Sequence, residues 1–566
     1  MYRKSLKRTK PRATNLSRKK ILLYRCILCF LIVTPFLVLC VIELILHFSS
    51  FNDDFRDPYV NISPFSIFSR ETINDEEFVS ITHRFAYAER KVQFTIRKPA
   101  NTVRIFVLGG SAAAGWPHQA HQTFSAYIQQ ALQKTLPEQK VEVINAASHG
   151  FASFRVRYIF DEIAGMDPDV ILIYSGNNEF IEKREYPIVV SLEWLASRLK
   201  SVQWLRSKIS QPKSNLPAND LQDVALFFWK KVKRQALDLR KDPEQFEKVK
   251  SHYRHTIEYM VRKASEKSIP VLLCTVPVNL RDWLPTVSYI RLTGQQLSEW
   301  QYHYNLGRKS LLESRYTTGI EAMKHAIQLE PEHAESHFWL GRLFEGTGRF
   351  SEALQSYQRA RDLDYNPFRA ISPFNETLRS IASRNEKVFL VDLEKTFNET
   401  SQTGSPGFDL FLDYVHPNTE GNILIAEKIY NTLKDYPILN RSIAATMLSR
   451  GNMEFAKISG GYDDASDIKV QLRLFSLYAI NHQYEAAIKQ TRKIIYLKTG
   501  EELSPNEIMH LDSLSPKIRE GYIAFHRYEN AQRMALLGQN ENITELDTSE
   551  KLLNAYYEKH WPYGRF

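Results

Sequence analysis

Ser111 stands in a sequence pattern that could make its hydroxyl a nucleophile. Residues 103–108 are almost all apolar, which is typical of a strand buried on both faces, and Gly109 and Gly110 follow directly. A strand that turns tightly into a helix would expose the Ser111 hydroxyl at the carboxyl edge of a parallel sheet, where ligands of open α/β folds bind. It would also place Ser111 beside the free N–H groups of a helix N-terminus, which stabilise negative charge. Taken alone, the stretch could also be a glycine-rich turn with an incidental serine.

Asp413 and His416 could activate such a hydroxyl. They are three residues apart, so a single turn can direct both side chains to one point. The carboxylate would accept a hydrogen bond from one imidazole nitrogen and fix the tautomer, which leaves the other nitrogen to take a proton from Ser111. By itself, Asp-x-x-His-Pro could equally be a capped turn that begins the next helix.

Acyl transfer by a serine also needs hydrogen-bond donors aimed at the developing oxyanion. Gly150 has no side chain, so its backbone N–H can approach closely, and Asn178 offers a side-chain amide at the end of a predicted strand. Each such donor is typically worth about 10²–10³ in rate. The alternative interpretations are a turn glycine for Gly150 and a strand-end cap for Asn178.

Each candidate residue follows a segment that is typical of a strand. The apolar runs alternate with helical patterns, which indicates an α/β fold with a mostly parallel sheet. The predicted strands are 103–108, 141–145, 168–174, 269–276 and 388–393.

Together these pieces resemble the SGNH (GDSL-like) hydrolase family, whose four sequence blocks occur here in the expected order. The blocks are 109–111, Gly150, 176–179 and 413–416. The resemblance covers 101–300 and 367–437, as the first and second parts of one domain. It implies a flavodoxin-like parallel sheet flanked by helices and an acyl-enzyme mechanism.

By this resemblance Ser111 is the nucleophile, His416 the base and Asp413 its orienting acid. The backbone N–H groups of Ser111 and Gly150 and the side chain of Asn178 would form the oxyanion hole. Two positions depart from the family pattern: Gly110 and Glu179 both replace an aspartate. We expect Gly110 to leave the nucleophile turn less well braced. No metal or cofactor is expected, because no ligand cluster or nucleotide-binding glycine motif is present.

A helical repeat pattern interrupts the predicted domain at 301–366. Leu306, Gly307, Tyr316 and Ala326 are followed 34 residues later by Leu340, Gly341, Phe350 and Ala360, which resembles two tetratricopeptide (TPR) repeats. Two repeats are too few to stand alone, so we expect them to pack on the catalytic domain or on the helical C-terminal region, 438–566. A generic helical insertion is the alternative. A further half-repeat could begin at Tyr484.

The N-terminus predicts a membrane anchor. Residues 1–25 hold ten Lys and Arg and no acid, and the remaining 64 basic residues equal the 64 acidic ones, so the net charge gives no argument for nucleic acid. Residues 26–48 are almost wholly apolar and long enough to cross a bilayer as a helix. The basic arm would stay cytoplasmic and place the rest of the chain outside the cytoplasm, in the periplasm of a Gram-negative bacterium. Residues 52–100 are expected to be an extended or β linker.

The sequence therefore predicts a membrane-anchored SGNH-type serine esterase that acts outside the cytoplasm. Its expected substrate is an O-acyl ester, such as an acetyl ester, of envelope or secreted carbohydrate. Two alternatives stay open. The same site could transfer the acyl group to a sugar hydroxyl instead of water, or the chain could be a non-catalytic assembly protein that binds partners through its repeats.

Overall fold

The computed structural model describes residues 66–181 except 74 and 82–92, residues 241–436 except 366, most of 438–560, and isolated positions between 23 and 45. The chain divides into two units, Met1–Pro64 with Arg184–Pro217, and Phe65–Lys183 with Ala218–Phe566. In the first unit the isolated positions are helical, and Phe30 and Leu44 are 69% and 63% exposed. Across the described part of the chain, no helix has the length and apolarity needed to span a bilayer. Much of the predicted anchor, 26–48, lies outside the described residues.

The second unit is built on a five-stranded parallel sheet, as the apolar runs predict. The strand order is β5 (Lys140–Asn145), β4 (Thr102–Gly109), β6 (Val170–Tyr174), β7 (Val271–Cys274) and β8 (Val388–Val391). Renumbered along the chain, this order is 2-1-3-4-5, the flavodoxin-like arrangement. All residues of β4, β6 and β7 are buried, which explains why their sequences are mostly apolar.

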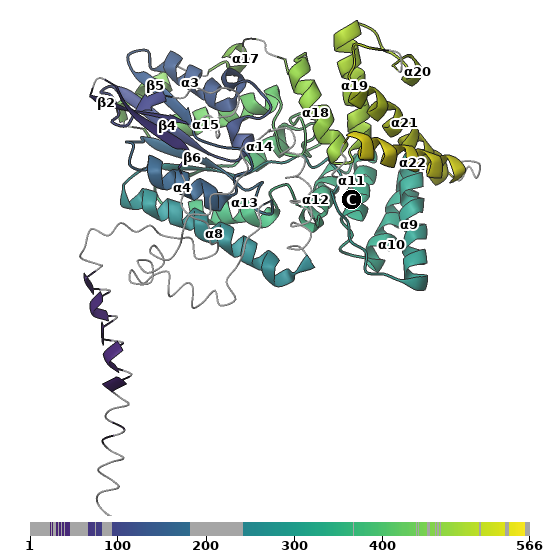
Figure 1. Ribbon diagram of the computed structural model, residues 1–566, viewed down its shortest axis with the longest axis horizontal. Helices are drawn as coiled ribbons and strands as arrows, with labels where there is room; N and C mark the ends of the chain where they lie inside the picture. Colours follow the sequence, from purple (N-terminus) through teal and green to yellow (C-terminus); the bar gives the residue numbers. More distant parts are fainter. Residues whose placement is uncertain are drawn as a thin grey trace, which may run out of the picture. The chain divides into compact units, whose positions relative to one another are not determined.

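Helices cover both faces of this sheet (Figure 1). On one face lie α3 (Phe124–Thr135) and α15 (Thr419–Asp435). On the other lie α4 (Ser153–Ile163), α8 (Pro243–Glu266) and α13 (Ser372–Ala382). The short helix α14 (Leu393–Thr400) follows β8. The α/β prediction is confirmed at this level.

The described part of the predicted linker is a small antiparallel sheet. It consists of β1 (Phe68–Ile73), β2 (Glu76–Ile81) and β3 (Gln93–Thr95). Rather than bridging freely, it packs on the large sheet. The Phe94 ring lies 5.6 Å from that of Phe106 on β4, and the Arg104 guanidinium donates to the Ile96 carbonyl at 3.1 Å. The Phe94 side chain of β3 is therefore covered by the large sheet.

Four helices occupy the predicted repeat region: α9 (Gly294–Leu312), α10 (Tyr316–Leu329), α11 (Ala334–Gly346) and α12 (Phe350–Leu363). The turns within the two pairs are alike. Ser314 and Gly348 both have positive φ, 58° and 74°. In each turn the next N–H bonds back into the preceding helix, Arg315 to the Ser310 carbonyl at 2.8 Å and Arg349 to that of Phe344 at 3.0 Å. The 34-residue period is thus visible in the backbone, while the TPR assignment stays a prediction.

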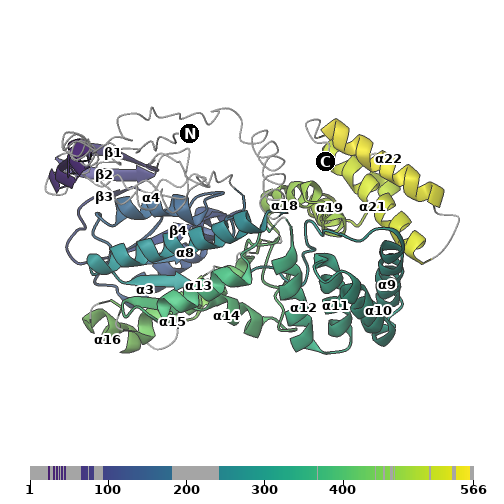
Figure 2. The same ribbon diagram turned by 90° about the horizontal axis from the view of Figure 1, so that it is seen from below.

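The C-terminal region is helical, as predicted (Figure 2). Its helices are α16 (Arg441–Ser449), α17 (Phe455–Ile458), α18 (Ile468–Ile480), α19 (Tyr484–Thr499), α20 (Pro505–Ile508), α21 (Pro516–Leu536) and α22 (Ile543–His560). The turn from α18 to α19 repeats the geometry above, with φ of 56° at His482. Lys309 on α9 donates to the Leu537 carbonyl at 3.3 Å, and Arg342 on α11 pairs with Asp282 of the α/β domain at 3.3 Å. The repeat helices therefore pack on both regions, as their small number led us to expect.

Candidate active site

The turn after β4 presents Ser111 at the carboxyl edge of the sheet. A side chain at Gly109 would lie 2.0 Å from the Tyr174 carbonyl oxygen, so only glycine fits where β4 and β6 approach. Ser111 begins α2 (Ser111–Ala114), which has only four residues and ends at Gly115 with φ of 89°. The expected contribution of a helix dipole is therefore small, and the turn itself exposes the hydroxyl.

The structure brings Ser111, His416 and Asp413 into one hydrogen-bonded chain. The Ser111 hydroxyl lies 2.8 Å from Nε2 of His416, and Nδ1 of His416 lies 2.6 Å from Oδ2 of Asp413. The Asp413 side chain is fully buried, and its Oδ1 accepts from the backbone N–H groups of Val415 and His416, both at 2.8 Å. The carboxylate is thus fixed in one orientation and can hold the imidazole in the tautomer that accepts the serine proton.

Two further groups define the position of His416. The ring of Trp116, which follows the nucleophile turn, has its centroid 4.5 Å from the His416 ring centroid. Buried His118 lies 2.9 Å from the Pro417 carbonyl through Nε2. Burial lowers the pKa of His118, partly offset by this hydrogen bond and by the charge of Asp464, so a neutral ring donates to that carbonyl near pH 7. Sequence reasoning missed His118, which lies 299 residues from Pro417.

The side chain of Asn178 lies directly beside the nucleophile turn. Its Nδ2 donates to the Phe151 carbonyl at 3.0 Å, and an added Cβ on Gly110 would lie 2.2 Å from the same nitrogen. An amide nitrogen carries two protons, so the second can be donated to a bound oxyanion. The Asn178 amide thus fills the space that a side chain at position 110 would occupy. Whether the turn is less well braced for lack of that side chain stays a prediction.

Gly150 lies in the loop that runs beside the end of β4. The Ala146 N–H donates to the Val107 carbonyl at 2.9 Å, and the Ser148 N–H donates to the Gly109 carbonyl at 3.1 Å. Gly150 itself has φ of 69°, a conformation that favours glycine. The loop is thus tied to β4, the strand that leads to Ser111.

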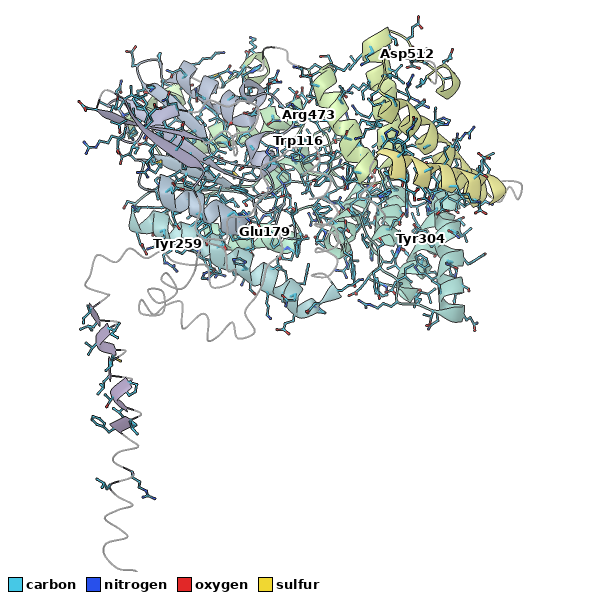
Figure 3. All side chains as sticks on the ribbon, in the orientation of Figure 1. Trp116, Glu179, Tyr259, Tyr304, Arg473 and Asp512 are labelled. Carbon is cyan, nitrogen blue, oxygen red and sulfur yellow. The ribbon has the colours of Figure 1, made fainter. Side chains whose placement is uncertain are left out.

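Glu179 is a buried cap. Its side chain is fully buried and accepts from the backbone N–H and the hydroxyl of Ser153, at 2.8 and 2.9 Å. Ser153 begins α4, and Ala152, the preceding residue, offers no side-chain cap. Glu179 (labelled in Figure 3) therefore accepts from the first N–H group of α4. This helix begins three residues after Gly150.

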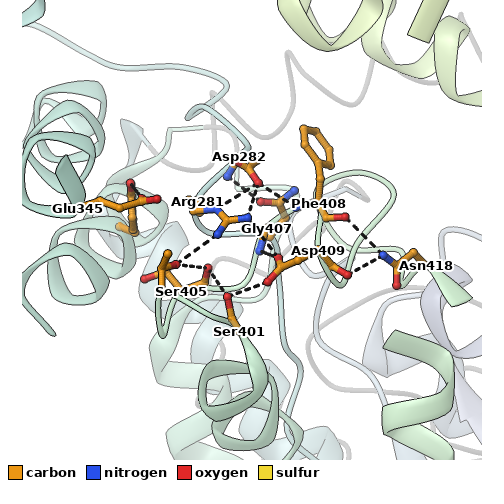
Figure 4. Close-up of polar contacts among 12 residues, drawn as sticks. Arg281, Asp282, Glu345, Ser401, Ser405, Gly407, Phe408, Asp409 and Asn418 are labelled. Atoms are coloured by element: carbon orange, nitrogen blue, oxygen red, sulfur yellow. Dashed lines mark hydrogen bonds and ion pairs between the residues drawn. The ribbon is translucent and has the colours of Figure 1, made fainter. Parts of the chain in front are cut away.

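A polar network supports the segment that leads to Asp413 (Figure 4). Asp282 accepts from the Arg281 guanidinium at 3.1 Å and from the Phe408 N–H at 2.9 Å, and Asp409 accepts from the Gly407 N–H at 2.6 Å and the Ser401 hydroxyl at 2.8 Å. Burial alone would raise the pKa of Asp282, but the charges of Arg281 and Arg342 lower it overall, so the group stays ionised. No local sequence signal marks this network.

Asn279, after β7, holds the same loop from the sheet side. Its side-chain amide donates to the Asp413 carbonyl at 3.0 Å, and its backbone N–H donates to the Tyr414 carbonyl, also at 3.0 Å. Asn279 is fully buried. Asn279 therefore holds the loop of Asp413 and His416 through the carbonyl of the acid and that of the residue after it.

No known protein family and no curated protein matches this chain. Solved structures to which this chain is similar include the acetyl xylan esterase AlAXEase, with 14% identity over 58% of this chain and 100% of that one and a TM-score of 0.27. TesA has 14% identity over 60% of this chain and 99% of its own, with a TM-score of 0.25. A variant of Axe2, an acetyl-xylooligosaccharide esterase from Geobacillus Stearmophilus, has 14% identity over 60% and 98% of the chains, with a TM-score of 0.28. Because these TM-scores are low, the similarity assigns no function to this chain.

Proposed function

We propose that this protein is an SGNH-type serine esterase that removes O-acyl groups from carbohydrate outside the cytoplasm. The observation that carries the proposal is the continuous chain from Asp413 through His416 to Ser111, with contacts of 2.6 and 2.8 Å. In the part of the chain that the structure describes, these groups converge at the carboxyl edge of the sheet, beside Asn178 and the loop of Gly150.

The reaction follows from these positions. The Ser111 oxygen attacks the ester carbonyl carbon while His416 takes the hydroxyl proton, and Asp413 stabilises the imidazolium that forms. The oxyanion would accept from the backbone N–H groups of Ser111 and Gly150 and from the Asn178 amide. When the ester C–O bond breaks, His416 gives the proton to the departing alcohol. A water molecule, deprotonated by the same ring, then attacks the acyl carbonyl carbon. The bond from that carbon to the Ser111 oxygen breaks, the carboxylic acid leaves, and His416 returns the proton to Ser111.

The anchor and the carbohydrate substrate belong to the proposal as well. A basic arm before an apolar helix would hold the enzyme at a membrane, and exposed apolar side chains at Phe30 and Leu44 suit a lipid environment. An enzyme outside the cytoplasm would meet acylated envelope or secreted polysaccharide. The helices of 301–366 would then offer a surface for a protein partner.

Hydrolysis of a chromogenic acetate ester by the full chain in detergent tests the reaction, with Ser111→Ala as the matched variant. We expect the variant to lose at least about 10³-fold in kcat because the nucleophile is absent. An acetylated xylo-oligosaccharide, assayed for released acetate, tests the substrate class. If the wild type and Ser111→Ala release acetate at the same rate from both substrates, the esterase assignment is wrong. Acetyl appearing on an added acceptor sugar instead of in solution would favour the transferase alternative.

A further inference from the structure

Helix α18 of the C-terminal region contacts both loops that meet at His416. The Tyr478 hydroxyl donates to the carbonyl of Leu412, the residue before Asp413. Arg473 donates from Nη1 to the Pro117 carbonyl at 2.8 Å, and Pro117 follows Trp116, whose ring lies against His416. Figure 3 labels Trp116 and Arg473. One helix therefore connects the loop after Ser111 to the loop that carries the acid and the base.

A second contact from the same region reaches the other end of that loop. Asp464, four residues before α18, accepts from the backbone N–H and the hydroxyl of Thr419, at 2.7 and 3.0 Å. Thr419 begins α15, three residues after His416. The acid–base loop is thus bonded to the C-terminal region both before Asp413 and after His416.

These contacts are buried and specific. Tyr478 and Asp464 are 5% and 8% exposed, and the Tyr478 ring lies 5.9 Å from that of Trp283 and 6.0 Å from that of Phe408. Burial, with the charge of Asp413, raises the pKa of Tyr478 well above its usual value, so the hydroxyl keeps the proton that it donates. A hydroxyl enclosed in this way can hold the Leu412 carbonyl in one place.

We propose that α18 is a positioning element of the active site: Tyr478 and Arg473 hold the loops on either side of His416 in the geometry that activates Ser111. The inference rests on the proposed esterase function. Small displacements of a catalytic group lower the rate steeply, so a helix outside the α/β sheet can be required for catalysis without touching substrate. Residues beyond 437 are then part of the catalytic unit, not a separate module.

The test is Tyr478→Phe in the full chain, which removes only the hydroxyl. The matched control is Tyr556→Phe, because Tyr556 is also buried in the C-terminal region and donates to a backbone carbonyl, that of Lys517 at 2.9 Å, away from the site. We expect Tyr478→Phe to lower kcat for a chromogenic acetate ester about fivefold to tenfold while KM stays within about twofold. The rate of covalent labelling of Ser111 by a fluorophosphonate should fall by the same factor, and the control should match the wild type in both measurements.

Arg473→Met gives a second measurement, because it keeps the aliphatic stem and removes the donor to Pro117. We expect it to lower the labelling rate of Ser111 as well. The inference is overturned if Tyr478→Phe and Tyr556→Phe have equal kcat and equal labelling rates, or if Tyr478→Phe changes KM alone. A wild type that neither labels nor hydrolyses would instead overturn the proposed function itself, so the two failures are distinguishable.

Discussion

At the scale of single residues, Gly110 determines how much room the Asn178 amide has beside the nucleophile turn. Its missing side chain leaves room for the Asn178 amide, which a Cβ would approach to 2.2 Å. We therefore expect Gly110→Ala to displace that amide and to lower kcat about 10²-fold, the usual cost of one oxyanion donor. Ester hydrolysis measures this, with Gly165→Ala as control, because the nearest atom to its added Cβ is the Glu162 carbonyl oxygen at 3.6 Å. Undiminished activity of Gly110→Ala would argue against Asn178 as a donor to the oxyanion.

At the scale of elements, Glu179 ties the start of α4 to the end of β6. Because it is fully buried and accepts two hydrogen bonds from Ser153, Glu179→Ala would leave both donors unsatisfied. We expect a loss of about 2 kcal/mol in the free energy of unfolding, measured by urea denaturation of the full chain. Asp242→Ala, which removes the exposed cap of α8, should cost about 1 kcal/mol or less. Equal costs for the two variants would show that burial of the cap is unimportant.

The elements also show what a sequence can predict and what it cannot. The parallel strands were predictable because burial on both faces requires nearly continuous apolar runs. The repeat helices were predictable because Gly307 and Ala326 recur 34 residues later as Gly341 and Ala360. The order of Ser111, Asp413 and His416 along the chain was enough to propose a site. The bond from Tyr478 to Leu412 and the cap from Glu179 to Ser153 join residues 66 and 26 positions apart. Such partners are chosen by tertiary packing, which leaves no local pattern.

At the scale of the whole molecule, the junction between α21 and the repeat helices holds a carboxyl group, that of Glu529, whose surroundings disfavour its ionised form. Burial raises the pKa of Glu529 to about 7, the charge of Glu485 adds to this, and Arg308 on α9 opposes it. Between the unfolded pKa of 4.5 and the folded value of about 7, the unfolded chain loses this proton first, so stability should fall as the pH rises through that window. Above pH 7 the loss is complete. At pH 8, Glu529→Gln should therefore raise the free energy of unfolding by about 1 kcal/mol after allowance for solvent screening, and so unfold at a higher urea concentration than the wild type. At pH 4.5 the two proteins should unfold at nearly the same urea concentration.

The control is Glu520, on the same helix, which pairs with Lys559 at 2.6 Å. Burial would raise the pKa of Glu520, but its hydrogen bonds to Lys559 and His560 outweigh that effect and lower it. Glu520→Gln should then shift the unfolding midpoint at pH 8 in the opposite direction. If Glu529→Gln shifts the midpoint equally at pH 8 and at pH 4.5, the carboxyl of Glu529 is not the group that makes this junction sensitive to pH.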